Sequence, residues 1–154
     1  MLFKSGTERY KKDIIKFGTK YKIDVLQDEK NIDTIKKLNL NNRQIDKIPA
    51  SICCLSNLEV IDLSFNKLVE LPSEFGDLKN LKSINLGFNR FENIPESICN
   101  LENLEVLSLD VNKINSITSS ISKLKNLREL NLFANQIPSL PDEIGMLTNL
   151  RKLN

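Results

Sequence analysis

Two carboxylates, Asp62 and Asp110, are the side chains of this sequence that could act together as a pair of acids. They belong to segments two repeats apart in a sequence with a fixed period. At the spacing of neighbouring strands they would lie about 10 Å apart, which is at or beyond the separation that inverting glycosidases use. No sequence feature predicts a deep pocket or a lid around them. We therefore expect no enzymatic activity and no catalytic residue.

The other groups with chemical potential are three thiols. The chain has no histidine, so the commonest general base and metal ligand is missing. Cys53, Cys54 and Cys99 are an odd number, and two of them are adjacent, which argues against a disulfide framework. Cys53 and Cys99 recur two repeats apart, and no CxxC motif is present to predict a zinc site. We expect no metal, no cofactor and a reducing, cytoplasmic location.

Length, charge and hydropathy limit the class of protein further. The chain has 154 residues and a net charge of +2, which suits one domain with no global attraction to nucleic acid. No run of eighteen apolar residues predicts a membrane span. The start, MLFKSGTERYKK, lacks the apolar region of a secretory signal. We expect no nucleic-acid partner.

Repeats of twenty-three residues must position these side chains. Leu58–Asn80 and Leu81–Asn103 align without a gap, with Leu or Ile at the first, fourth and sixth places, Asn at the ninth and Pro at the fifteenth. A fixed period of this kind predicts a solenoid. Residues 35–154 contain five complete repeats and a truncated sixth, and residues 1–34 precede them. Repeats begin at Ile35, Leu58, Leu81, Leu104, Leu127 and Leu150.

Each repeat should contribute one short strand. Places three to seven alternate outward and inward, which is the period of a strand, and successive copies should pair as a parallel sheet. The ninth-place asparagines can bond backbone groups that a tight bend leaves unpaired. The fifteenth-place prolines favour an extended segment, and the asparagine at every twenty-third place is typical of a turn.

The pattern LxxLxLxxNxLxxLPxxIxxLxx over Ile35–Asn154 resembles the leucine-rich repeat family. Its repeat length and proline motif resemble the intracellular subgroup of Ras-associated scaffolds and Ras suppressors, and they are also similar to repeats in some bacterial proteins. The resemblance implies an α/β fold, a curved solenoid with the parallel sheet on its concave face. It also implies a protein partner bound there, such as a small GTPase or a phosphatase. Three positions depart from the pattern: Arg43 at the ninth place, Thr118 in place of Pro, and Pro138 at the twelfth place.

Residues 1–34 are predicted to form an N-terminal cap. Tyr10, Ile14, Phe17 and Tyr21 recur at helical spacing, which predicts an amphipathic helix over about residues 7–17, with Thr7 as its N-cap and Gly18 as its stop. Residues 22–26 could form a short strand, and 28–31 a turn. A cap would cover the apolar end of the first repeat. The alternative is a basic helix that binds a membrane or a partner.

Ten outward residues are the candidate partner-binding site. They combine the three outward strand columns, at the third, fifth and seventh places, with the eighth place just beyond. Phe65, Phe88 and Val111 would form an apolar cluster there, together with Phe133. Gly87 would leave room beside it, and the two aspartates favour a basic partner. Alternatively, the phenylalanines lie flat as part of the scaffold. The set is Val60, Asp62, Phe65, Asn85, Gly87, Phe88, Val106, Asp110, Val111 and Phe133.

We therefore interpret the sequence as a non-catalytic protein–protein interaction scaffold of intracellular signalling. The alternative is a targeting segment of a larger signalling enzyme, such as a kinase, cyclase or ubiquitin ligase, that continues beyond residue 154. The truncated sixth repeat leaves an open strand edge and apolar core, which predicts self-association through this end unless more chain follows.

Overall fold

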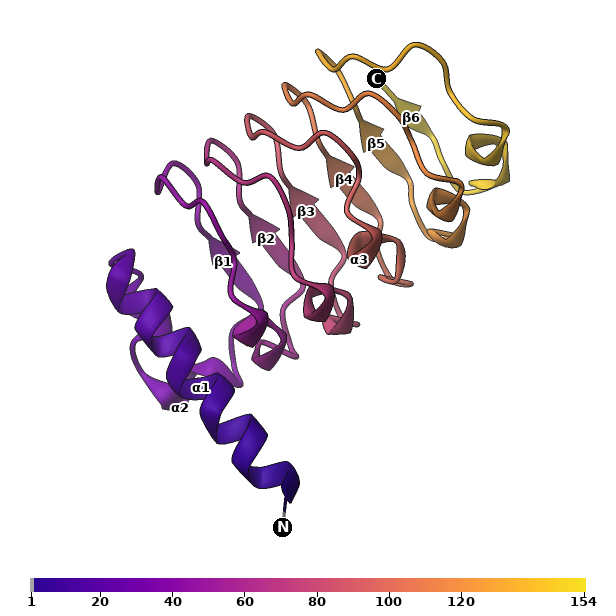
Figure 1. Cartoon of the computed structure of the whole chain (residues 1–154). Coiled ribbons are helices and arrows are strands. Elements are labelled where there is room, and N and C mark those ends of the chain that lie inside the picture. The colour runs from indigo at the N-terminus through magenta and orange to yellow at the C-terminus, as the bar shows by residue number, and fades with distance from the viewer. Residues whose placement is uncertain (1) are drawn as a thin grey trace.

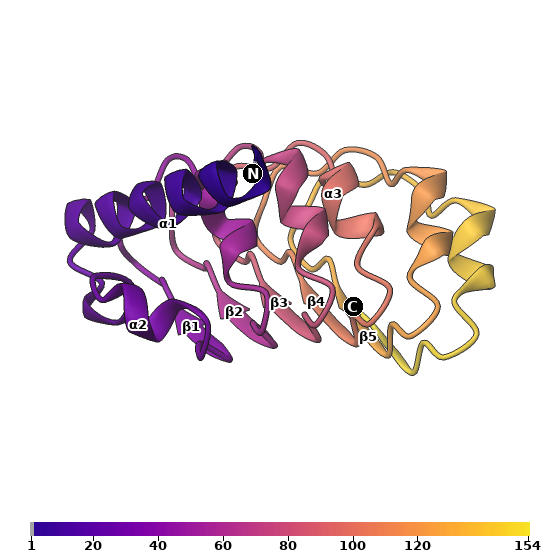
Figure 2. The ribbon, with the colours of Figure 1, turned by 90° about the horizontal axis from the view of Figure 1, so that it is seen from below.

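The computed structural model describes residues 2–154, and side chains from residue 8 onward. Six short strands form one parallel sheet in the order β1-β2-β3-β4-β5-β6, on one side of the solenoid, with helical turns on the other side (Figures 1 and 2). The strands are β1 (Lys37–Asn39), β2 (Val60–Asp62), β3 (Ser83–Asn85), β4 (Val106–Ser108), β5 (Glu129–Asn131) and β6 (Lys152–Leu153). The α-helices are α1 (Leu2–Lys20), α2 (Glu29–Ile32) and α3 (Glu96–Cys99), and 3-10 helices span Asp24–Leu26, Ala50–Cys54, Ser73–Asp77, Ser119–Lys123 and Asp142–Met146.

The twenty-three-residue period sets the register of the sheet. Ile61 pairs with Ile84, and Ile84 with Leu107, so equivalent places stand side by side. The central residue of each of these strands is at most 1% exposed, while its neighbours are half-buried. One continuous hydrophobic core therefore runs through the repeats, and no repeat buries its apolar side chains alone.

The chain returns from each strand through a short helical turn that follows the fifteenth place. Pro72 is extended, with φ −65° and ψ 153°, immediately before the turn Ser73–Asp77. Thr118 takes nearly the same backbone angles, φ −68° and ψ 148°, and its hydroxyl accepts a bond from Ser120 N. Threonine can replace proline here because it caps the turn that proline only pre-orients.

Two sets of asparagines tie the repeats together. The asparagine ladder comprises the ninth-place residues Asn66, Asn89, Asn112 and Asn135, and Asn66 bonds Leu40 O, Leu63 O and Ile45 N. At the twenty-third place each amide donates to a carbonyl of the preceding repeat, as Asn80 does to Ser56 O at 2.8 Å. The predicted structural role of both sets is confirmed, and each spans neighbouring repeats rather than a single bend.

The N-terminal segment differs from its prediction in three respects. The helix α1 spans Leu2–Lys20, so Thr7 lies inside it and Gly18 does not end it. Gly18 has no left-handed backbone that would end the helix, and its role is close packing, since a Cβ on it would lie 2.6 Å from Leu26 Cβ. The strand predicted over 22–26 is a 3-10 helix at Asp24–Leu26, and the turn predicted over 28–31 begins α2, capped by Asp28.

The apolar face of α1 packs on the first repeat. Ile14 is fully buried and Phe17 is 7% exposed, and both belong to the same core as the repeat leucines. Arg43, which replaces the ninth-place asparagine, donates to the carbonyls of Tyr21 and Lys22, each at 3.1 Å. The Tyr21 hydroxyl donates to Asp46 and lowers the pKa of that carboxyl. The departure at Arg43 therefore joins the first repeat to the N-terminal segment.

At the other end of the sheet, Leu147 itself is 4% exposed, but the core of the last complete repeat is partly open to solvent, as expected. Ile137, Ile144 and Leu150 are half-buried, whereas the equivalent residues one repeat earlier are 0% exposed, and Leu140, Met146 and Leu153 are exposed. β6 has one strand neighbour. Self-association through this end stays a prediction.

Candidate protein-binding surface

The parallel register brings the predicted strand residues into columns on the sheet face. Val60 is in register with Ser83 and Val106, and Asp62 with Asn85 and Ser108. All six side chains are half-buried. A hollow of about 220 Å³ lies on the same face between β4, β5 and β6, and Val106 is among its lining residues. The face is thus shallow, with mixed apolar and polar side chains.

The eighth-place residues adopt a left-handed backbone conformation. Phe65 and Phe88 have φ 56°, Val111 has φ 51°, and Asn42 and Ala134 share this geometry. Such angles are uncommon for residues other than glycine, and for a β-branched valine they are strained. This bend lets the following ninth-place asparagine turn inward while the eighth-place side chain stays outside. The sequence offered no direct signal for it, because phenylalanine and valine are not left-handed residues by propensity.

Phe65 and Phe88 stack on each other, with ring centroids 4.1 Å apart and an interplanar angle of 11°. The rings nonetheless remain 51% and 42% exposed. Both alternatives for these residues are therefore partly met, since the rings pack on each other and still present one open apolar surface. Val111 follows in the next repeat and is half-buried.

Phe133 lies one repeat further along, at the seventh place, and is 68% exposed. Its carbonyl accepts a bond from Val111 N at 2.8 Å, which holds the two loops side by side. We call Phe65, Phe88, Val111 and Phe133 the apolar edge. Exposed clusters of this kind mark interaction surfaces more often than isolated exposed residues do.

The two aspartates are engaged within their own repeats. The Ser64 hydroxyl and Ser64 N donate to Asp62 Oδ1 at 2.6 and 2.9 Å, and the Ser108 hydroxyl donates to Asp110 Oδ1 at 2.6 Å. Neither carboxylate lines the hollow between β4, β5 and β6. Asp62 accepts from a backbone N–H two residues on, as in a turn, and Asp110 accepts from a side-chain hydroxyl.

Gly87 does not provide the open space expected of it. It is buried, and a Cβ on it would lie 2.6 Å from Asp110 Oδ1 and 3.3 Å from Asn85 Oδ1. The Asp110 carboxylate already occupies the volume that the missing side chain leaves. A larger residue at Gly87 would have to displace the Asp110 side chain, and Gly87 lies beneath the surface a partner would contact.

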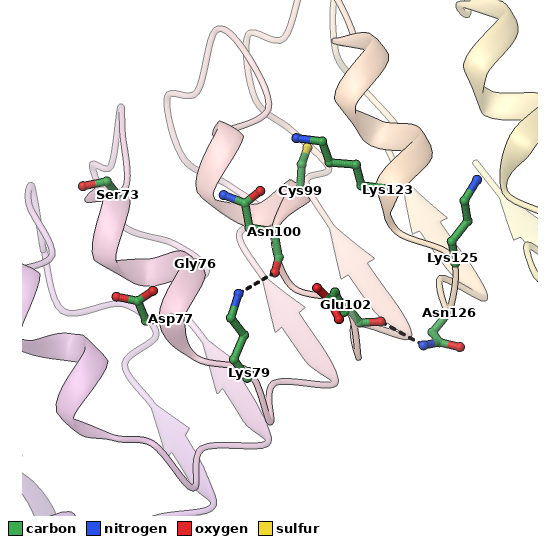
Figure 3. Close-up of a pocket in the computed structure, with 10 residues that line it drawn as sticks. All are labelled: Ser73, Gly76, Asp77, Lys79, Cys99, Asn100, Glu102, Lys123, Lys125 and Asn126. Carbon is green, nitrogen blue, oxygen red and sulfur yellow. Dashed lines mark hydrogen bonds between the residues drawn. The ribbon is translucent and has the colours of Figure 1, made fainter.

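A larger hollow, of about 620 Å³, lies among the helical turns on the face opposite the sheet (Figure 3). Lys79 donates to Asn100 O at 3.0 Å there, and Asn126 donates to Glu102 O at 2.8 Å. None of the ten predicted residues lines it. Its lining contains lysines and acidic side chains, and hydrogen bonds between neighbouring repeats cross it. We therefore interpret this hollow as the space between successive helical turns.

The three cysteines are free thiols. Burial raises the pKa of Cys53, and it raises the pKa of Cys54 and Cys99 to about 11. No group of three or more metal-ligating side chains occurs among the described residues. Within the same part of the chain, no helix is long and apolar enough to cross a membrane.

These pKa values predict slow alkylation. A thiol with a pKa of about 11 stays protonated until the pH approaches that value, so its reactive thiolate at pH 8 is about 100-fold scarcer than for an ordinary thiol. We expect iodoacetamide to react with Cys54 and Cys99 about 100-fold more slowly in the folded protein than in urea. The rate should rise steadily between pH 8 and 10. Equal rates in the folded and unfolded protein at pH 8 would contradict the assignment.

A leucine-rich repeat region model matches residues 19–135, and a second leucine-rich repeat model matches residues 126–147. The chain belongs to the leucine-rich repeat family. Domains of this family generally act as protein–protein interaction modules, and neither model describes an enzymatic activity. The search of curated proteins returns no match.

Solved structures agree with this assignment. A leucine-rich repeat protein from Leptospira interrogans is 34% identical over 77% of this chain and 36% of its own, with a TM-score of 0.66. The ectodomain of the Arabidopsis thaliana receptor kinase GASSHO1/SCHENGEN3, solved in complex with CASPARIAN STRIP INTEGRITY FACTOR 2, is 29% identical over 80% of this chain and 16% of its own, with a TM-score of 0.71.

The repeat domain of the type III effector XopL shares the fold, with a TM-score of 0.74 at 22% identity over 80% of this chain and 45% of its own. The chain therefore spans less than half of the length of each of these structures.

Proposed function

We propose that this leucine-rich repeat protein is a non-catalytic scaffold that binds a partner protein on its concave sheet face and the adjoining apolar edge. The observation that carries the proposal is the exposed stack of Phe65 on Phe88. Aromatic side chains that stay accessible while held rigidly are typical of the residues that dominate binding energy at interfaces. The half-buried Val60 and Val106 on the sheet extend the same surface.

A cytoplasmic location and a role in signalling belong to the same proposal. Three free thiols, two of them on adjacent residues, suit a reducing compartment. A small GTPase or a phosphatase as the partner rests on the resemblance of the repeats to Ras-associated scaffolds.

A second candidate is a recognition segment within a larger signalling enzyme. The chain spans 16% of a receptor kinase ectodomain and 45% of an effector repeat domain. Repeats of this kind can therefore serve as parts of longer proteins. Reading the parent gene beyond Asn154 decides between the two: a catalytic domain there supports the segment, and a stop codon supports the scaffold.

The double substitution Phe65→Ala with Phe88→Ala tests the proposed surface. It removes the exposed stack but no fully buried side chain, so we expect the partner's Kd to rise at least about 30-fold. The midpoint of thermal unfolding should fall by only a few degrees. Affinity capture followed by titration of the purified partner measures the first quantity, and circular dichroism the second.

Met146→Ala is the matched control, because Met146 is 53% exposed but lies in a helical turn, away from the strand ends that carry the apolar edge. It should leave the Kd unchanged. A double variant that unfolds much more easily yet binds as tightly as the wild type would show that the stack is only structural.

A further inference from the structure

A column of three cations borders the apolar edge. Lys67, Arg90 and Lys113 occupy the tenth place of successive repeats, each one residue beyond the buried asparagine ladder. All three are exposed. Among the residues whose side chains are described, none forms an ion pair with them. We call these residues the cation column.

Charged residues at the second place of the repeats form ion pairs, unlike those of the cation column. There the signs alternate over the first five repeats, and Glu59 pairs with Lys36 at 3.1 Å and with Lys82 at 3.0 Å. Arg128 pairs with Glu105 at 3.5 Å in the same way. The cation column has the same spacing between repeats but a single sign, so its members repel one another mildly.

The aspartates beside the apolar edge form no ion pair with these cations. Asp62 and Asp110 accept bonds from Ser64 and Ser108, so their acceptor capacity is partly used inside the fold. On the outer side, Arg90 lines a hollow of about 660 Å³ with Glu70, Glu92 and Glu96 and forms an ion pair with none of them. Among the described side chains, the exposed cations of the column therefore lie unpaired beside Phe65 and Phe88, which favours an acidic partner over the basic one expected from the aspartates.

We propose that the partner contacts this surface through an acidic polypeptide segment, with apolar side chains on the apolar edge and carboxylates on the cation column. The inference rests on the proposed protein-binding function and specifies the chemistry of the partner. At the spacing of the sheet the column extends about 10 Å, which is the length of about three extended residues. Two or three carboxylates in a short segment would match it.

A protein segment fits this surface better than a nucleic acid does. Aromatic side chains beside cations are also found in proteins that bind single strands. However, such proteins track the backbone with a continuous positively charged groove, whereas this surface offers three cations over about 10 Å. A net charge of +2 provides no wider attraction to polyanions.

The test uses the full chain and three fluorescent probes. They are a twelve-residue peptide that alternates Glu with Phe or Leu, the same peptide with Lys for each Glu, and a twelve-nucleotide oligothymidylate. The protein variants are the triple reversal Lys67→Glu, Arg90→Glu and Lys113→Glu and a control with the same net charge, Lys12→Glu, Lys47→Glu and Lys123→Glu. The control residues are exposed and lie outside the cation column.

We expect the acidic peptide to bind most tightly, with a Kd that rises at least about tenfold in the triple reversal and with added salt, and not in the control. Tighter binding of the basic peptide or the oligonucleotide would overturn the inference. So would an equal loss in both triple variants, or no binding of the acidic peptide.

The variant Phe65→Ala with Phe88→Ala separates this inference from the proposed function. If it loses the peptide while the triple reversal does not, the acidic-partner inference fails and the binding surface stands. If neither variant changes affinity for the peptide or for the captured partner, both fail. Unchanged circular dichroism of every variant excludes misfolding as the cause.

Discussion

Asn89→Ala is expected to lower the free energy of unfolding by about 3 kcal/mol, although it removes a polar side chain that makes no contact with a ligand. Asn89 Oδ1 accepts from Leu68 N at 3.0 Å, and its Nδ2 donates to Leu63 O and Leu86 O, each at 3.0 Å. Leu68 is fully buried, so water cannot replace the lost acceptor. An unsatisfied buried N–H costs more than the mean value of a hydrogen bond.

Loss of the Asn89 side chain should cost less free energy at the carbonyls of Leu63 and Leu86 than at Leu68 N. Leu63 O also accepts from Asn66, and Leu86 O also accepts from Asn112. Most of the loss in the alanine variant should therefore come from Leu68 N. Urea unfolding followed by circular dichroism measures it.

Asn103→Ala is the matched control. Asn103 is an exposed twenty-third-place asparagine with one bond, to Lys79 O at 2.9 Å. Because water can replace that bond, its loss should cost less than about 1 kcal/mol. Equal destabilisation by Asn89→Ala and Asn103→Ala would show that burial of the asparagine ladder is not what makes it stabilising.

Gly18→Ala should destabilise the protein by about 3 kcal/mol, at the upper end for overpacking. In an exposed helix interior the same change stabilises by up to about 1 kcal/mol. Here the new Cβ would lie 2.6 Å from Leu26 Cβ and 3.1 Å from the backbone carbon of Leu26. Backbone cannot move aside cheaply, so α1 would have to shift away from the 3-10 helix Asp24–Leu26.

Gly145→Ala provides the comparison, because a Cβ there meets no atom within 4 Å. It should leave stability unchanged or raise it slightly. Thermal unfolding of the two variants checks the prediction. If Gly18→Ala lowered the unfolding temperature no more than Gly145→Ala, the close packing of α1 on Leu26 would be contradicted.

The repeat architecture could be predicted from sequence alone, because a solenoid is encoded by a pattern that recurs in phase. Leu or Ile at the first, fourth and sixth places predicts which side chains are buried. The fixed period predicts which residues lie side by side in neighbouring repeats. Ile61, Ile84 and Leu107 accordingly share one buried row. The asparagine ladder followed from the same argument, since each ninth place meets the same bend.

The N-terminal segment and the details of the surface were decided by tertiary contacts. A glycine near the end of a helical pattern suggests a stop, but Gly18 is the point where α1 touches Leu26. Likewise, an aspartate on an outward column suggests a free charge, but Asp110 fills the space above Gly87 and accepts from Ser108.

What the sequence determined by itself is therefore the repeated framework: the leucine and isoleucine core, the parallel sheet and the two sets of bonding asparagines. What only the tertiary structure decided is which outward groups remain available. The left-handed bend at Phe65 and Phe88 and their stacking arise between repeats. Local pattern encodes whether a side chain points in or out, whereas its partner across a repeat depends on the packed backbone.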